Sequence, residues 1–117
     1  MFKGCTSLTI APSILPATTL ASECYAEMFS NCTSLTTAPE LPALTLVSSC
    51  YYLMFNGCSS LSYIKALFTT TPSSSYTSNW VYGVAPSGTF IKSSEATWNV
   101  NGVHGVPNGW TVQTAST

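Results

Sequence analysis

The sequence predicts an α/β repeat solenoid in which each coil holds a short parallel strand, a Pro-rich turn and a short helix, with an irregular, β-rich C-terminal cap. Three observations support this prediction. The phrases MFKGCTSL, MFSNCTSL and MFNGCSSL begin at Met1, Met28 and Met54. Apolar residues spaced four apart lead into the second and third phrases, and prolines follow the first and second. A fixed period of this size is typical of chains built by stacking one structural unit.

The repeat divides the chain into two regions. Residues 1–64 form repeats of about 26 residues, with units at 1–27 and 28–53 and the start of a third at 54. Residues 65–117 form a degenerate last coil and a C-terminal cap, because a terminal coil must cover the open end of the core. The length suits a single domain.

Two short helices are expected, one before each of the second and third phrases. Spacing of four keeps side chains on one face of a helix. This spacing relates two sets of residues: Leu20, Cys24, Met28 and Cys32, and then Leu46, Cys50, Met54 and Cys58. Gly4, Asn31 and Gly57 hold one equivalent position and are expected to stop the helices, because Gly and Asn tolerate the left-handed conformation.

Extended segments are expected after each helix stop. CTSLTIA, CTSLTTA and CSSLSYI are rich in Ser and Thr and would turn Cys, Leu and Ala or Ile toward the core. Pro residues then turn the chain. In the tail, Gly88–Lys92 and Trp110–Val112 are expected to be strands, the second after the turn signal Asn108–Gly109.

A family resemblance rests on three features: the CxxL pattern, the turns at Leu15–Pro16 and Leu41–Pro42, and the aromatic residue before GC or NC. Together they resemble the leucine-rich repeats of BspA-like bacterial surface proteins, over residues 1 to about 64. The resemblance implies stacked leucine-rich-repeat coils. It also implies a non-enzymatic binding or adhesion module that recognises an extracellular protein or a glycan, at the cell surface as part of a longer chain. The N-terminus of this sequence lacks the pattern of a signal peptide.

All five cysteines follow the repeat period. Cys5, Cys32 and Cys58 form one series, and Cys24 and Cys50 form another. We expect a structural ladder of small buried side chains. Disulfides remain an alternative, since stacked coils lie about 4.8 Å apart, within reach of a bridge. No metal site is expected, because close pairs such as CxxC are missing.

Composition excludes several classes of function. Charged residues make up 6% of the chain and include three lysines and no arginine. Nucleic-acid binding needs a cationic footprint, so no nucleic-acid partner is expected. No apolar run reaches the length of a membrane span, so no membrane insertion is expected. His104 has no Asp to orient it, and neither an enzyme nor a cofactor is expected.

The expected binding surface is the outward face of the sheet, which carries mainly hydroxyl groups. Its candidate residues are Thr9, Ser34, Thr36, Thr37, Ser62 and Tyr63. A lower-ranked surface is in the tail, where Trp98 and Trp110 could stack on sugar rings, although covering the open end of the core is the favoured role of these tryptophans. Two alternative functions stay open: a structural spacer and cap of a longer array, and, by resemblance, a segment of a phage virion or receptor-binding protein. Self-association through an uncapped N-terminal end is a further expectation.

Overall fold

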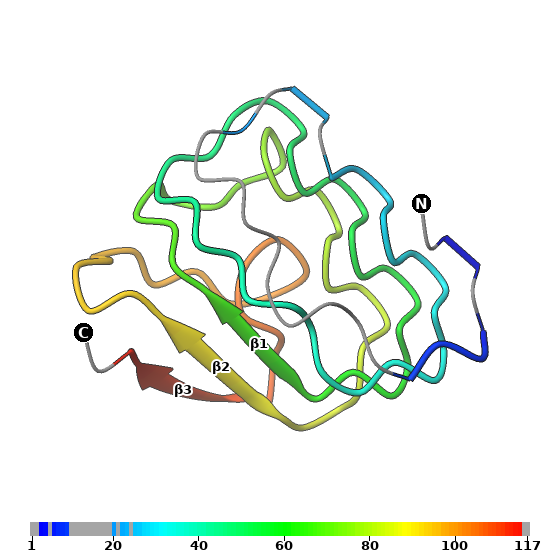
Figure 1. The fold of residues 1–117 in the computed structure, drawn as a ribbon. Coiled ribbons are helices and arrows are strands. Elements are labelled where there is room, and N and C mark those ends of the chain that lie inside the picture. Colours follow the sequence, from blue (N-terminus) through cyan, green and yellow to red (C-terminus); the bar gives the residue numbers. More distant parts are fainter. Residues whose placement is uncertain (1–2, 5, 10–19, 21, 24, 116–117) are drawn as a thin grey trace.

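The strands of the protein form one open parallel sheet. The computed structural model describes residues 3–115 apart from residues 5, 10–19, 21 and 24. Within these residues the elements are β1 (Tyr63–Ala66), β2 (Thr89–Lys92) and β3 (Thr111–Thr114), in the order β1-β2-β3. All neighbours are parallel, and the sheet lies along one side of the molecule (Figure 1). The strands expected at Gly88–Lys92 and Trp110–Val112 correspond to β2 and β3.

The expected α/β repeat solenoid of leucine-rich-repeat coils is wrong. The described residues contain no helix and only three short strands, so the molecule is a small β-rich domain. It follows that none of these residues form a helix able to cross a membrane. Of the extended segments expected at 32–38 and 58–64, Tyr63 and Ile64 begin β1, and Thr37 contributes one bridge to Tyr63.

The segments expected to be helical are instead ribbons of successive turns. We call residues 22–23 with 25–31 the first turn ribbon and residues 47–57 the second, and residues 73–83, for which no helix was expected, form the third. Within a ribbon, alternate N–H groups donate three residues back, as from Met54 to the Tyr51 carbonyl at 3.0 Å. The N–H groups between them donate to the next ribbon, as from Phe29 to the Met54 carbonyl at 2.9 Å. A helix would use every one of these N–H groups within its own segment.

Left-handed residues explain why a spacing of four misled the sequence prediction. Positive φ angles recur every fourth residue, at 60°, 57° and 61° for Glu23, Glu27 and Asn31. In the second ribbon Ser49 and Leu53 have φ of 53° and 51°. One left-handed residue per four breaks a helix but gives a ribbon with the same spacing of buried residues.

The three expected helix stops do adopt the left-handed conformation. Gly4, Asn31 and Gly57 have φ of 73°, 61° and 80°. The helices that they were expected to end are not present, so that role is wrong. Each is instead a left-handed residue within a run of turns. The N–H groups of Asn31 and Gly57 donate to the carbonyls of Asn56 and Tyr82 in the next ribbon.

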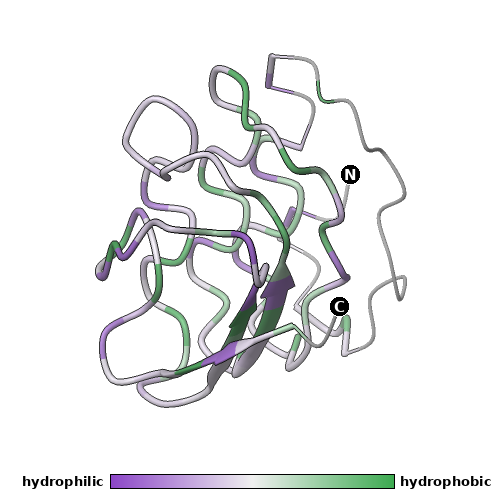
Figure 2. Cartoon of the chain, turned by 90° about the vertical axis from the view of Figure 1, so that its left-hand side faces the viewer, coloured by the Kyte–Doolittle hydropathy of each residue, from purple (hydrophilic) through white to green (hydrophobic). Residues whose placement is uncertain are grey.

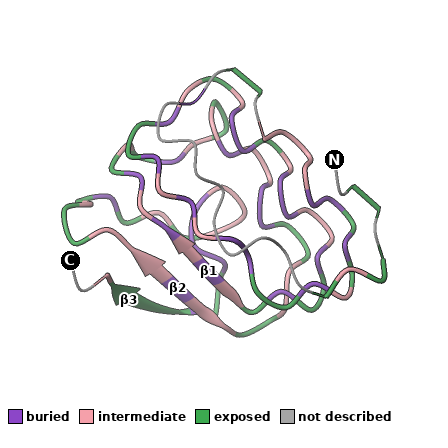
Figure 3. Ribbon diagram, viewed as in Figure 1, coloured by how far each residue is buried: buried purple, intermediate pink, exposed green. Residues whose placement is uncertain are grey.

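Stacked side chains fill the space between the ribbons and the sheet. Phe29 stacks on Phe55 with ring centroids 5.7 Å apart, and Tyr51 stacks on Trp80 at the same distance. Buried residues lie on the inner side of each layer (Figure 3). Like side chains meet because the backbone bonds join residues about one repeat apart.

The loop at residues 101–106 covers the last ribbon. The Trp80 Nε1 donates to the Gly105 carbonyl at 3.0 Å, and the Val81 N–H donates to the Val103 carbonyl at 3.4 Å. The Asn79 N–H donates to Nδ1 of His104 at 3.0 Å. These contacts supply acceptors for the third ribbon where no further ribbon follows it.

Replacing Ser49 by Gly tests the turn ribbons. We expect Ser49→Gly to raise the free energy of unfolding by about 0.5–1 kcal/mol, because Gly relieves the cost of a left-handed L-residue. The matched control Ser48→Gly changes an exposed neighbour without a positive φ and should lower the free energy of unfolding. Urea unfolding measures both. A helix over this segment would instead make both changes destabilising.

Gly57→Ala tests the close stacking of the ribbons. Its φ is 80°, and an added Cβ would collide with the side-chain oxygen of Asn31. Gly4 has a φ of 73°, and no atom of the described residues lies within 4 Å of an added Cβ, so Gly4→Ala isolates the backbone cost. We expect about 1–2 kcal/mol of destabilisation for Gly4→Ala and a larger loss for Gly57→Ala. Equal losses would show that the Asn31 contact is unimportant.

Candidate functional site

Burial distinguishes the two faces of the sheet. Ile64 and Phe90 are in register and fully buried, so their side chains point into the core. Side chains alternate between faces along a strand. Tyr63, Lys65 and their partners in β2 and β3 therefore point outward, and we call this surface the outer face. Hydrophilic and hydrophobic residues both occur on these strands, as Figure 2 shows.

One row of hydroxyl groups crosses the outer face. Tyr63 pairs with Thr89, and Thr89 pairs with Thr111, each in parallel register. A bridge joins Thr37 to Tyr63 and extends the row by one position. Neighbouring strands lie about 4.8 Å apart, so the hydroxyl-bearing residues are regularly spaced. The row offers donors and acceptors without charge.

A second row on the outer face contains one charged residue. It consists of Lys65, Ile91 and Gln113, in parallel register. The Lys65 Nζ lies 3.3 Å from Oε1 of Glu40, and about a third of each side chain is exposed. Such a pair contributes little stability, but it offsets the lysine charge on this face.

The structure places four of the six predicted surface residues in or next to the hydroxyl row. Thr37 and Tyr63 belong to the row. Thr36 and Ser62 precede them, and the Ser62 N–H donates to the Thr36 carbonyl at 3.0 Å. Thr9, Thr36, Thr37 and Ser62 are exposed, whereas Ser34 and Tyr63 are half-buried.

Sequence reasoning missed Thr89 and Thr111 as members of the row. Thr89 lies one repeat after Tyr63 and in an expected strand, so the period could have identified it. Thr111 follows after a shorter interval, because the segment between β2 and β3 departs from the repeat. Only the register of the folded sheet reveals its place.

The tail tryptophans do not form a surface for sugar rings. Trp98 is 3% exposed and stacks on Phe68 with centroids 5.2 Å apart. Trp110 is 7% exposed, and its Nε1 donates to the Ala85 carbonyl at 2.8 Å. Both rings pack into the interior, so they cannot stack on a ligand without unfolding.

His104 has structural partners on two sides. Its Nδ1 accepts from the Asn79 N–H, and its carbonyl accepts from the Thr77 hydroxyl at 2.6 Å. These bonds hold the covering loop on the third ribbon. Among the described residues, no group of three or more His, Cys, Asp or Glu side chains could hold a metal ion.

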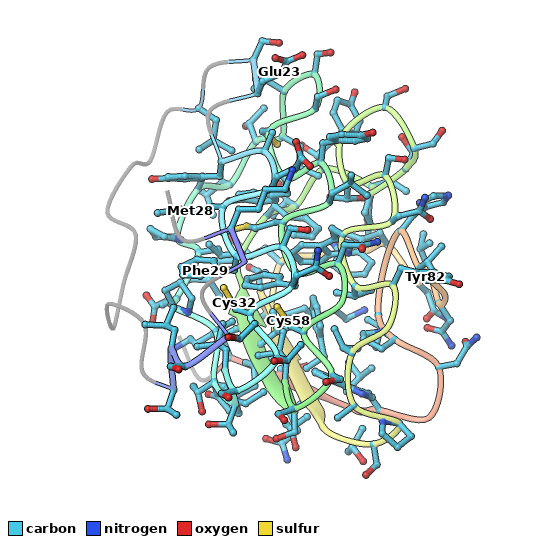
Figure 4. All side chains as sticks on the ribbon, turned by 90° about the vertical axis from the view of Figure 1, so that its right-hand side faces the viewer. Glu23, Met28, Phe29, Cys32, Cys58 and Tyr82 are labelled. Atoms are coloured by element: carbon cyan, nitrogen blue, oxygen red, sulfur yellow. The ribbon has the colours of Figure 1, made fainter. Side chains whose placement is uncertain are left out.

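The described cysteines are in the core. Cys32, Cys50 and Cys58 have no exposed surface, and Figure 4 shows Cys32 and Cys58 on neighbouring layers. Cys5 and Cys24 lie outside the described residues. Cys58 carries a free thiol that donates to the Phe29 carbonyl at 2.9 Å. Burial raises the pKa of this thiol to about 12.

Comparison of the chain with protein-family models, curated proteins and solved structures found no match.

The raised pKa of Cys58 predicts a loss of stability at alkaline pH. The unfolded chain releases the thiol proton near pH 9, while the folded protein retains it to about pH 12. The free energy of unfolding should therefore fall between these values, by up to about 1.4 kcal/mol per pH unit. Below pH 9 the thiol contributes no pH dependence.

The control for this pH prediction is Cys58→Ser, which keeps a hydrogen-bond donor but does not titrate in this range. Its unfolding measured by urea from pH 8 to pH 11 should lose less stability than the wild type. Because the two proteins share all their other side chains, the difference between the curves reports Cys58. Parallel curves would show that Cys58 does not contribute.

Proposed function

We propose that this chain is a non-enzymatic binding module that recognises an extracellular protein or a glycan through its outer face. The observation that supports the proposal is the hydroxyl row of Thr37, Tyr63, Thr89 and Thr111. Such a surface binds through hydrogen bonds and shape, with a small contribution from charge.

Three further observations agree with this proposal. Within the described part of the chain, the hydroxyls of the row make no hydrogen bond to another residue, so they can bond to a partner. The resemblance to BspA-like surface proteins agrees with an adhesive role at the cell surface. His104 is engaged by Asn79 and Thr77, which favours a structural role for it.

A binding screen with two matched variants tests the proposal. The purified chain would be measured against extracellular-matrix proteins and a glycan panel, at low and high salt. Thr89→Lys places a bulky charge within the hydroxyl row. Ser74→Lys adds the same charge at an exposed turn outside the sheet. We expect saturable binding that survives high salt, at least a tenfold loss for Thr89→Lys and no change for Ser74→Lys.

The outcome also separates the alternative functions. Binding that is equally strong in Thr89→Lys would place recognition elsewhere on the molecule. Failure of the chain to bind any protein or glycan in the panel would favour the structural spacer and cap. If the same chain is also measured against intact bacterial cells, binding to the cells but not to the panel would favour the virion or receptor-binding role.

A further inference from the structure

The third strand is an open edge of the sheet. β3 pairs with β2 on one side, and it is the last strand in the order β1-β2-β3. All four of its residues are exposed, as the green arrow in Figure 3 shows. No other segment of the described chain forms a backbone hydrogen bond with Val112 or Thr114. β3 can therefore accept another strand.

The backbone geometry shows which groups of β3 are available. The Thr111 N–H donates to the Gly88 carbonyl, and the Ala115 N–H donates to the Lys92 carbonyl, both at 2.8 Å. In a parallel pair, alternate residues direct both backbone groups to the same neighbour. Thr111, Gln113 and Ala115 thus bond toward β2. The N–H and C=O groups of Val112 and Thr114 point away from the sheet.

The edge lacks the devices that usually protect an exposed strand. Such strands are commonly blocked by charged residues, prolines or bulges. The sequence of β3 is TVQT, which has no charge and no proline. Val112 is in register with Ile64 and Phe90, which are fully buried, yet it is 43% exposed. A core-facing apolar position is therefore uncovered at this edge.

We propose that β3 pairs with β3 of a second copy of this chain, antiparallel, about a twofold axis at Gln113. Val112 of each copy then lies opposite Thr114 of the other, and each such pair exchanges two N–H···O bonds. Gln113 lies opposite the second copy's Gln113, and Thr111 lies opposite Ala115. The two sheets join into one continuous sheet with both outer faces on the same side.

A second copy fits this edge because the edge is self-complementary. A twofold contact brings identical surfaces together, so a charge on β3 would be repeated across the contact, and a charge at position 113 would lie directly opposite its copy. β3 has none, and the whole chain has a formal net charge of −1. The pairing also covers part of Val112. The proposal uses the edge of the sheet and not its outer face, so it stands independently of the proposed binding function.

Charge variants at Gln113 test the dimer. Sedimentation velocity of the wild type should show a concentration-dependent dimer. Gln113→Lys and Gln113→Glu each oppose like charges across the axis, so each alone should weaken dimerisation at least tenfold. An equal mixture of the two should recover the dimer, because opposite charges then meet. Thr111→Lys is the matched control: it adds an equal charge on the same strand, opposite Ala115, and should weaken the dimer less.

Thr114→Pro provides a second test that does not depend on charge. It removes an N–H that points away from the sheet while leaving the bonds to β2. We expect a folded monomer, verified by circular dichroism and thermal unfolding of each variant. A wild type that stays monomeric at millimolar concentration would overturn the proposal. A dimer whose affinity is unchanged in both Gln113→Lys and Gln113→Glu would also overturn it. So would a β3 edge that binds an added peptide strand but not a second copy of the chain.

Discussion

The structure depends on backbone hydrogen bonds that join each layer of the chain to the layer about one repeat later. In the turn ribbons, every second N–H donates across this gap, as from Phe29 to Met54 and from Phe55 to Trp80. The N–H groups between them are satisfied three residues back within the same ribbon. Buried backbone groups must be hydrogen-bonded. Together these two sets of bonds meet that requirement in the ribbons without a helix.

The same backbone bonds determine which side chains meet in the core and on the outer face. Because layers stack in register, Phe29 meets Phe55 and Tyr51 meets Trp80 inside the molecule. On the other side, the register aligns Thr37, Tyr63, Thr89 and Thr111 in one row. The aromatic stack and the hydroxyl row are therefore two consequences of one backbone arrangement. A change that shifts the stacking, as expected for Gly57→Ala, should disturb both.

At the C-terminal end of the stack, the described residues cover the third ribbon but not the last strand of the sheet. At the third ribbon, the loop at residues 101–106 supplies acceptors such as the Val103 carbonyl and Nδ1 of His104. At the sheet, β3 lacks an equivalent cover and leaves Val112 partly exposed. Covering the ribbons protects the aromatic core, whereas the open strand offers regular backbone donors and acceptors. This contrast supports the proposed pairing of two copies at the edge of the sheet.

The sequence by itself determined the repeat period, the left-handed positions at Gly4, Asn31 and Gly57, and the approximate places of β2 and β3. The repeat, the glycines and the turn residues reflect local backbone preferences, so they can be recognised in the sequence without knowledge of the fold. It did not determine that the residues four apart form turn ribbons, because a helix gives the same spacing of buried side chains. The N–H groups of left-handed Glu23 and Leu53 donate to the next layer, which lies one repeat away in the sequence. Tertiary structure alone decided that Thr111 joins the hydroxyl row and that Trp98 and Trp110 are buried, since register and packing depend on residues far apart in the chain.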